Sequence, residues 1–135
     1  MKKYILIILM LLILILPTLL VKYFVKDYNE IKMDIRITNA NTIGVNSDTD
    51  GLHFGRVPGG SNAFRKIHVF TEKCNKCKVS LVKTGDFKDW VTISKNNFYL
   101  YNNKTEDVII NVNVPLDARM ADYNGTLKIY FWKVI

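Results

Sequence analysis

The chain is poor in residues that carry covalent chemistry. It has two cysteines and two histidines among 135 residues, and none of its four serines stands in a Gly-x-Ser-x-Gly motif. Neither histidine has sequence neighbours that would mark it as a general base. The sequence therefore predicts a protein that is not an enzyme, uses no cofactor and has no evident small-molecule substrate.

A concentrated basic stripe is also absent. The formal net charge is +7, but Lys2, Lys3, Lys22 and Lys26 flank an apolar segment and account for four of the positive charges. The remaining 15 of the 19 lysines and arginines are scattered among all 12 acidic residues. Without a clustered positive patch or a recognised binding module, the sequence predicts no affinity for nucleic acid.

Charge is missing altogether from Tyr4 to Val21, a run made mostly of leucine and isoleucine. A helix of that length rises about 27 Å at ~1.5 Å per residue, close to the roughly 30 Å hydrocarbon core of a bilayer. Pro17 is compatible with such a helix. The sequence therefore predicts one transmembrane helix with basic flanks in residues 1–26, in contact with membrane lipid along residues 4–25.

Small residues are lacking where a cleavable signal peptide would need them. No Ala, Gly or Ser lies between Tyr4 and Thr38, and no cysteine precedes Cys74 to accept a lipid. The apolar segment is therefore predicted to stay on the protein as a signal-anchor.

Two features predict the orientation of the chain. Lys2 and Lys3 favour a cytoplasmic N-terminus. Asn103-Lys-Thr and Asn124-Gly-Thr are glycosylation acceptor triplets, and both fall where turn residues predict loops. We therefore expect a single-pass protein of the cell membrane with an extracytoplasmic C-terminal domain.

Helical periodicity is missing after Val25, and a two-residue alternation replaces it. Ile31, Met33, Ile35 and Ile37 alternate with charged residues, which is the spacing of a strand. Turn residues separate the further apolar segments that follow. These are Leu52–Phe54, Lys66–Phe70, Lys78–Val82, Trp90–Ile93, Phe98–Tyr101, Val108–Val114 and Leu127–Trp132.

Closely spaced short strands predict the fold of the C-terminal part. Seven to nine of them, with frequent turns, are typical of an all-β immunoglobulin-like β-sandwich, and a small barrel is the alternative. Residues 27–42 are interpreted as a membrane-proximal first strand and linker. Residues 43–135 are interpreted as the β-sandwich domain.

Several short motifs of this domain resemble a known group. They are, in order, Phe54-Gly-Arg-Val-Pro-Gly-Gly60 within Val45–Ile67, Arg65 with the strand after it, Trp90-Val-Thr-Ile-Ser94, Val114-Pro115 and Tyr123-Asn-Gly-Thr-Leu127. Together they resemble small archaeal membrane-anchored proteins with an extracytoplasmic immunoglobulin-like sandwich. The Phe-Gly-x-Val-x-x-Gly part also resembles immunoglobulin-like modules of the major-sperm-protein-like group. The resemblance covers most of residues 43–131 and implies the fold, but no function and no active residues.

The cysteines form the motif Cys74-Asn-Lys-Cys77, which has three interpretations. A disulfide that pins a turn is the favoured one for an extracytoplasmic domain. A metal site would need further ligands, and His68 on the preceding strand is the candidate third one. A redox pair is expected where a strand enters a helix, whereas this motif lies in a predicted hairpin.

A short acidic segment resembles the start of a calcium-binding loop. Asn46, Asp48 and Asp50 place oxygen atoms at alternate positions, and Gly51 is the sixth residue. The twelfth is Val57, where such a loop needs a bidentate glutamate. Capping of a turn by these side chains is the ordinary alternative to calcium binding.

The functional prediction follows from the predicted anchor, the fold and the lack of catalytic groups. We expect a non-enzymatic interaction or structural module of the cell envelope that contacts another envelope or surface protein. One alternative is an accessory protein of the archaellum or another surface machine, by analogy of architecture alone. The other is metal or redox handling through Cys74 and Cys77.

Overall fold

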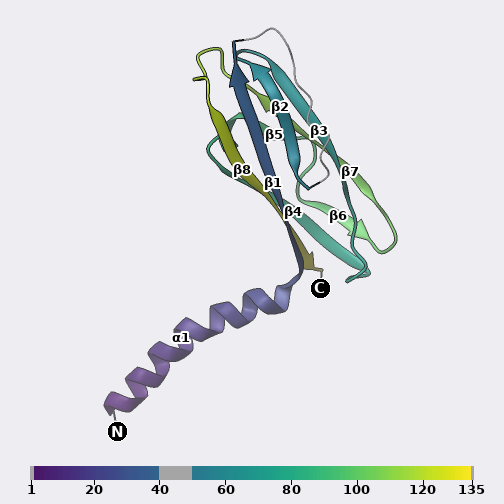
Figure 1. Ribbon diagram of the computed structural model, residues 1–135. Coiled ribbons are helices and arrows are strands. Elements are labelled where there is room, and N and C mark those ends of the chain that lie inside the picture. Colours follow the sequence, from purple (N-terminus) through teal and green to yellow (C-terminus); the bar gives the residue numbers. More distant parts are fainter. Residues whose placement is uncertain (1, 40–49, 135) are drawn as a thin grey trace.

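The computed structural model describes residues 2–39 and 50–134, which form one helix, one 3-10 turn and eight strands (Figure 1). In chain order the elements are α1 (Lys2–Phe24), β1 (Val25–Thr38), β2 (Leu52–Pro58), β3 (Asn62–Val69), β4 (Lys76–Gly85), η1 (Lys88–Trp90), β5 (Val91–Ile93), β6 (Phe98–Tyr101), β7 (Glu106–Asn113) and β8 (Asp122–Lys133). Every apolar segment expected to be a strand overlaps an observed one, so the prediction of an all-β domain is confirmed.

The strands form two sheets that pack face to face. The five-stranded sheet has the order β2-β1-β8-β4-β6, and the three-stranded sheet has the order β3-β7-β5. The first strand lies inside the larger sheet, where it pairs parallel with β2 and antiparallel with β8. A two-sheet β-sandwich is thus confirmed, whereas its assignment to the immunoglobulin-like type stays a prediction.

The core lies between the sheets and follows from the alternation along the strands. In β1, Met33, Ile35 and Ile37 are at most 3% exposed, while the charged residues between them point outward. Phe54 and Phe87 meet edge to face with their ring centroids 6.3 Å apart. Full burial of such a side chain stabilises the fold by roughly 1.5–3 kcal/mol.

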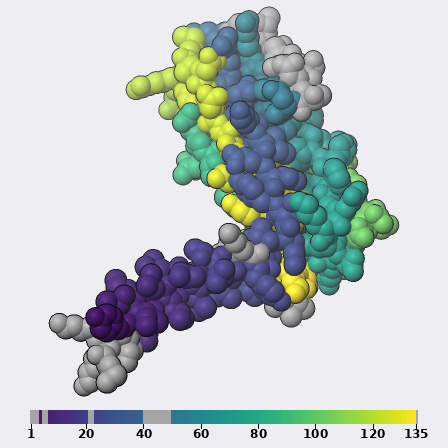
Figure 2. Space-filling view, turned by 60° about the horizontal axis from the view of Figure 1, so that its bottom comes forward, coloured from purple at the N-terminus to yellow at the C-terminus, as the bar shows by residue number. Residues whose placement is uncertain are grey.

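The helix leaves the sandwich at the end where β1 begins and β8 finishes (Figure 1). Figure 2 shows it standing apart from the strands. We call this the helix end, and the opposite end, where β1 finishes, the far end. Phe24 of α1 is followed directly by Val25 of β1, and Lys133 Nζ donates a 3.2 Å hydrogen bond to the hydroxyl of Tyr23.

The membrane prediction needs correction. Among the residues that the structure describes, no helix is both long enough and apolar enough to cross a membrane. This finding corrects the prediction of a single-pass anchor with lipid contact along residues 4–25, a cytoplasmic N-terminus and an extracytoplasmic C-terminal domain.

The prediction of a turn at Asn124-Gly125 is also wrong, because both residues lie inside β8. Asn124 pairs with Asp34 of β1, and Gly125 pairs with Gly85 of β4. A strand that is paired on both sides can override the local turn preference of an Asn-Gly dipeptide, since strand propensity depends strongly on tertiary context.

Candidate functional site

The outer face of the five-stranded sheet carries the side chains that the core does not use. On β1, β4 and β8 these are the even-numbered residues, and on β6 they are the odd-numbered ones, because successive side chains of a strand point to opposite faces. This outer face has two distinct regions. One is a polar groove at the far end, and the other is a group of aromatic side chains at the helix end.

The polar groove is a surface hollow of about 440 Å³ formed by β1, β2 and the start of β8. It is lined by Asp34, Ile35, Arg36, Gly55, Arg56, Asp122 and Asn124. Two acidic and two basic side chains therefore share one small cavity, so their pairing decides what charge the groove offers to a ligand.

A bulge in β2 builds one wall of the groove. Asp34 of β1 pairs with His53 of β2. Two residues further along β1, Arg36 pairs with Arg56, which is three residues further along β2. The extra residue is accommodated at Gly55, whose φ of 74° lies in the left-handed region that glycine adopts without strain. The bulge brings both His53 and Arg56 to the outer face.

One arginine of the groove is engaged by a carboxylate. Arg36 Nε donates to Asp122 Oδ1, and Arg36 Nη2 donates to Asp122 Oδ2 at 2.8 Å. The carboxylate raises the pKa of Arg36, and the guanidinium lowers the pKa of Asp122. The two side chains are 54% and 59% exposed, so solvent screens the pair and its main effect is to orient both groups.

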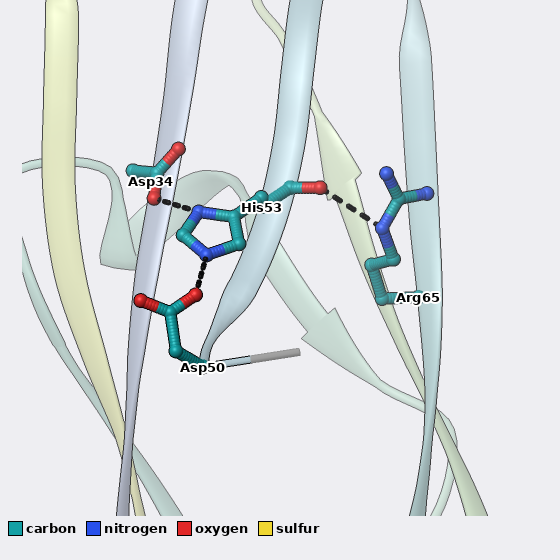
Figure 3. A network of polar contacts seen from close by, with 4 residues as sticks. All are labelled: Asp34, Asp50, His53 and Arg65. Carbon is teal, nitrogen blue, oxygen red and sulfur yellow. Dashed lines mark hydrogen bonds and ion pairs between the residues drawn. The ribbon is translucent and has the colours of Figure 1, made fainter. Parts of the chain in front are cut away.

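His53 lies between two carboxylates (Figure 3). Its Nδ1 is hydrogen-bonded to Asp34, and its Nε2 lies 2.8 Å from Oδ1 of Asp50. The contact with Asp50, followed by that with Asp34, raises the pKa of His53, and the first contact lowers the pKa of Asp50. Arg65 of β3 donates a 2.9 Å hydrogen bond to the backbone carbonyl of His53, which links the two sheets.

The contacts of His53 fix the position of the β2 wall of the groove, and they differ from those of a catalytic histidine. Each of the two ring nitrogens of His53 has a carboxylate partner (Figure 3). Neither nitrogen is left to accept a proton from a substrate. These contacts instead join β1 to the segment at the start of β2.

The aromatic row, at the helix end of the same face, crosses the sheet from β1 to β6. Its members are Tyr28, Tyr130, Trp132, Tyr99 and Tyr101. The ring centroids of Tyr28 and Tyr130 are 5.0 Å apart, and those of Tyr130 and Trp132 are 5.9 Å apart. Lys78 of β4 pairs with Trp132 on one side and with Tyr99 on the other, which makes the row continuous.

Lysines accompany the row without carboxylate partners. Lys76 Nζ lies 4.8 Å from the ring centroid of Tyr99 and 5.6 Å from that of Tyr101, which is cation–π geometry. Considering only residues 2–39 and 50–134, neither Lys76 nor Lys78 forms an ion pair. The side chains of Tyr99 and Tyr101 are each 52% exposed. The row is therefore an accessible surface that is aromatic and basic.

The two cysteines of the sequence motif are joined as a disulfide. Cys77 of β4 is completely buried, and Cys74 packs against the core. The carbonyl of Asn75, between them, accepts a 2.9 Å hydrogen bond from the backbone N–H of Asn102. The bridge therefore sits in a loop that is tied to the turn after β6, and in this bonded state neither sulfur is a thiolate ligand.

The structure does not bring His68 together with the cysteines. His68 lies on the outer face of the three-stranded sheet, where its Nδ1 is 2.6 Å from Oδ1 of Asp107. Lys66, followed by His68, lowers the pKa of Asp107. Within the described ranges, no group of three or more His, Cys, Asp or Glu side chains is arranged to hold a metal ion.

The calcium prediction lies mostly outside the described residues. Asn46 and Asp48 fall in the segment 40–49, which the structure does not describe. Asp50 is described and contacts His53 through its carboxylate. Binding of calcium by this segment stays a prediction.

Both glycosylation candidates are exposed. Asn103 lies in the turn between β6 and β7 with a φ of 58°. Asn124 lies in β8, where its backbone N–H donates to Asp86 Oδ2 at 3.2 Å and its carbonyl accepts from the Asp86 N–H at 2.9 Å. Modification at either position stays a prediction.

Sequence reasoning missed both the groove and the aromatic row. The signal that could have found them is the set of charged and aromatic residues at outward positions, such as Asp34 and Arg36 in β1 or Tyr130 and Trp132 in β8. Alternation identifies these positions strand by strand. It does not reveal which strands are neighbours, and both regions depend on that.

Comparisons with known proteins give little more than a distant likeness. No family model matches the chain, and no curated protein matches it. The selenomethionine form of the AfaE-3 adhesin from Escherichia coli aligns with 82% of this chain and 99% of its own at 12% identity and a TM-score of 0.40. The DraE adhesin in complex with chloramphenicol succinate covers 82% and 98% at 13% identity and the same TM-score. Likeness at this level carries no argument about function, and the resemblance to archaeal membrane-anchored proteins stays a prediction.

Proposed function

We propose that the chain is a non-enzymatic binding module that holds an acidic surface of another protein against the aromatic row. The observation that carries this proposal is the row itself, with five aromatic side chains and their lysines on an exposed sheet face. Tyrosine and tryptophan dominate the binding energy of many protein interfaces, because they bury a large area and lose little conformational entropy.

The dimensions of the row suit a protein partner. Its members come from β1, β8 and β6, with β4 between the last two, so the row spans three strand spacings, or about 14 Å at ~4.8 Å each. That width is typical of the centre of an interface in which each partner buries about 800 Å².

The charge of the row argues for an acidic partner. Lys76 and Lys78 have no carboxylate partner among the described residues. The nearby carboxylate of Glu30 accepts a hydrogen bond from the hydroxyl of Tyr28, which raises the pKa of Tyr28 to about 12. Carboxylates on a partner would supply the charges that the lysines lack, and complementary charge speeds association and selects the partner.

Site-specific photo-crosslinking tests the proposal. A photoreactive amino acid replaces Tyr99 or Tyr101 in the full-length chain, in the cells that make the protein. The control carries it at Asn113, an exposed position on the outer face of the three-stranded sheet. We expect one defined protein to be crosslinked from the row and not from the control. Equal crosslinking from all three positions, or none from the row, would contradict the proposal.

Charge reversal provides the second arm of the test. The double variant Lys76→Glu/Lys78→Glu should lose the crosslinked product by at least about tenfold, because like charges placed together at an interface cost several kcal/mol. Lys104→Glu, in the turn after β6, is the matched control and should keep it. Retention of the product by the double variant would rule out an acidic partner for the row.

A further inference from the structure

The polar groove contains an arginine that has no ion-pair partner among the described residues. Arg36 and Arg56 are directly paired on the neighbouring strands β1 and β2. Like charges in this position repel, which makes the arrangement unfavourable unless something neutralises it. Asp122 neutralises Arg36. Arg56, in contrast, is exposed and forms no ion pair with any residue that the structure describes.

Two other polar groups of the groove affect which ligand it can bind. The carboxylate of Asp34 is hydrogen-bonded to His53 and forms no ion pair with Arg56. The side-chain amide of Asn124 lines the groove and has no hydrogen-bond partner within residues 2–39 and 50–134, whereas its backbone is bonded to Asp86. A guanidinium and an amide donor therefore face the same cavity of about 440 Å³.

We propose that this groove binds a carboxylate group, with Arg56 as its main ligand and Asn124 as a second hydrogen-bond donor. The planar guanidinium presents two parallel N–H groups that match the two oxygens of a carboxylate. The wall carboxylates of Asp34 and Asp122 repel additional negative charge, so a carboxylate with a single charge is favoured over a phosphate dianion. The site lies at the far end of the sheet and does not depend on the partner proposed for the aromatic row.

The carboxylate can belong to the end of a peptide chain, to an acidic side chain or to a free acid. All three present the same group to Arg56, and the experiment separates them. The 15N-labelled full-length chain is titrated with N-acetyl-glycylglycine, N-acetyl-aspartic acid amide, acetate and inorganic phosphate. N-acetyl-glycylglycine amide, which lacks the charge, is the control. The signals followed are the Arg56 Nε–H and the Asn124 side-chain amide.

The expected result is a saturable shift of both signals with at least one carboxylate and none with the amide control. The carboxylate that binds most tightly identifies the source. Phosphate should bind at least about fivefold more weakly. Equal binding of the acid and its amide, or tighter binding of phosphate, would overturn the proposal.

Variants assign the binding to the groove. Arg56→Gln should weaken it at least tenfold, and Arg56→Lys should restore part of it, because a lysine keeps the charge and loses the planar fork. Asp122→Asn should strengthen binding, since it frees Arg36 and removes a repelling charge. Lys104→Gln, outside the groove, is the control. Unchanged affinity in Arg56→Gln, whose folding is checked by its thermal unfolding, would also overturn the proposal.

Discussion

Gly85 and Gly125 face each other across the ladder between β4 and β8, closer than any side chain would permit. A Cβ atom added to Gly85 would lie 2.4 Å from the Cα of Gly125 and 2.5 Å from the carbonyl oxygen of Asn124. A Cβ added to Gly125 would lie 2.7 Å from the carbonyl oxygen of Thr84. The two glycines thus let β4 and β8 approach each other beside the groove.

Gly85→Ala should destabilise the protein by about 2–4 kcal/mol. The φ of Gly85 is +108°, so an alanine would carry backbone strain as well as the clash with β8. Urea unfolding followed by circular dichroism measures the loss. Val82→Ala, at an exposed position of the same strand, is the control and should cost less than about 1 kcal/mol. A loss in Gly85→Ala no larger than in the control would mean that the close approach is not required.

Gly55→Ala should cost about 1–2 kcal/mol, because an alanine pays a steric penalty at the positive φ of the β2 bulge. Gly55→Asn should cost less, since asparagine adopts that conformation more readily. The same unfolding assay measures both variants. If alanine and asparagine cost the same, the left-handed backbone is not what makes glycine necessary here.

Removing the disulfide should lower the free energy of unfolding by about 2–3 kcal/mol. The bridge closes a loop with a sequence separation of 3, for which the loss of chain entropy is small, and the buried position of Cys77 adds to the effect. The variant Cys74→Ala/Cys77→Ala is compared with the wild-type protein in urea, with and without a reductant. Reductant should destabilise the wild type and leave the variant unchanged. A wild type that keeps its stability after complete reduction would contradict this prediction.

Stability should depend on pH through His53 and Asp50. The raised pKa of His53 stabilises the fold below its unfolded value of about 6.5, and this contribution is lost as the pH rises through the folded value. The lowered pKa of Asp50 stabilises the fold above about 3.9, and that contribution is lost as the pH falls. The pair therefore favours a stability maximum between about pH 4 and 6.5.

Melting temperatures measured from pH 4 to 9 test this dependence. In the wild type they should fall as the pH rises above about 6.5, and His53→Gln should flatten that slope. Asp117→Asn, which removes a negative charge in the loop before β8, is the control and should keep the slope. An identical slope in His53→Gln would assign the pH dependence to other groups.

Local patterns were sufficient to place the strands. The alternation of Met33, Ile35 and Ile37 with charged residues depends only on the two-residue period of an extended chain, and that period is visible in the sequence. The same reasoning failed at Asn124-Gly125, because the dipeptide has a strong turn preference. Its pairing partners, Asp34 and Gly85, are distant in the sequence.

The apolar run near the N-terminus shows a different limit. The sequence correctly indicates a helix there, and the structure forms α1 over Lys2–Phe24. Length and hydropathy of the full run predicted a membrane span, whereas no described helix meets both requirements. The local sequence is enough to predict that a segment is helical, but it is not enough to predict what surrounds the helix.

The sequence alone was enough to predict a helix followed by seven to nine short strands, and the alternation in β1 separated the core-facing side chains from the outward ones. The three-dimensional structure was needed to show that Arg56 lies beside Arg36 and that His53 lies between Asp34 and Asp50. It was also needed to show that Tyr28, Tyr99 and Tyr130 share one face. The physical reason is the range of the interactions. Alternation acts between residues two apart, whereas strand order and register are set by packing and hydrogen bonds between segments far apart in the chain.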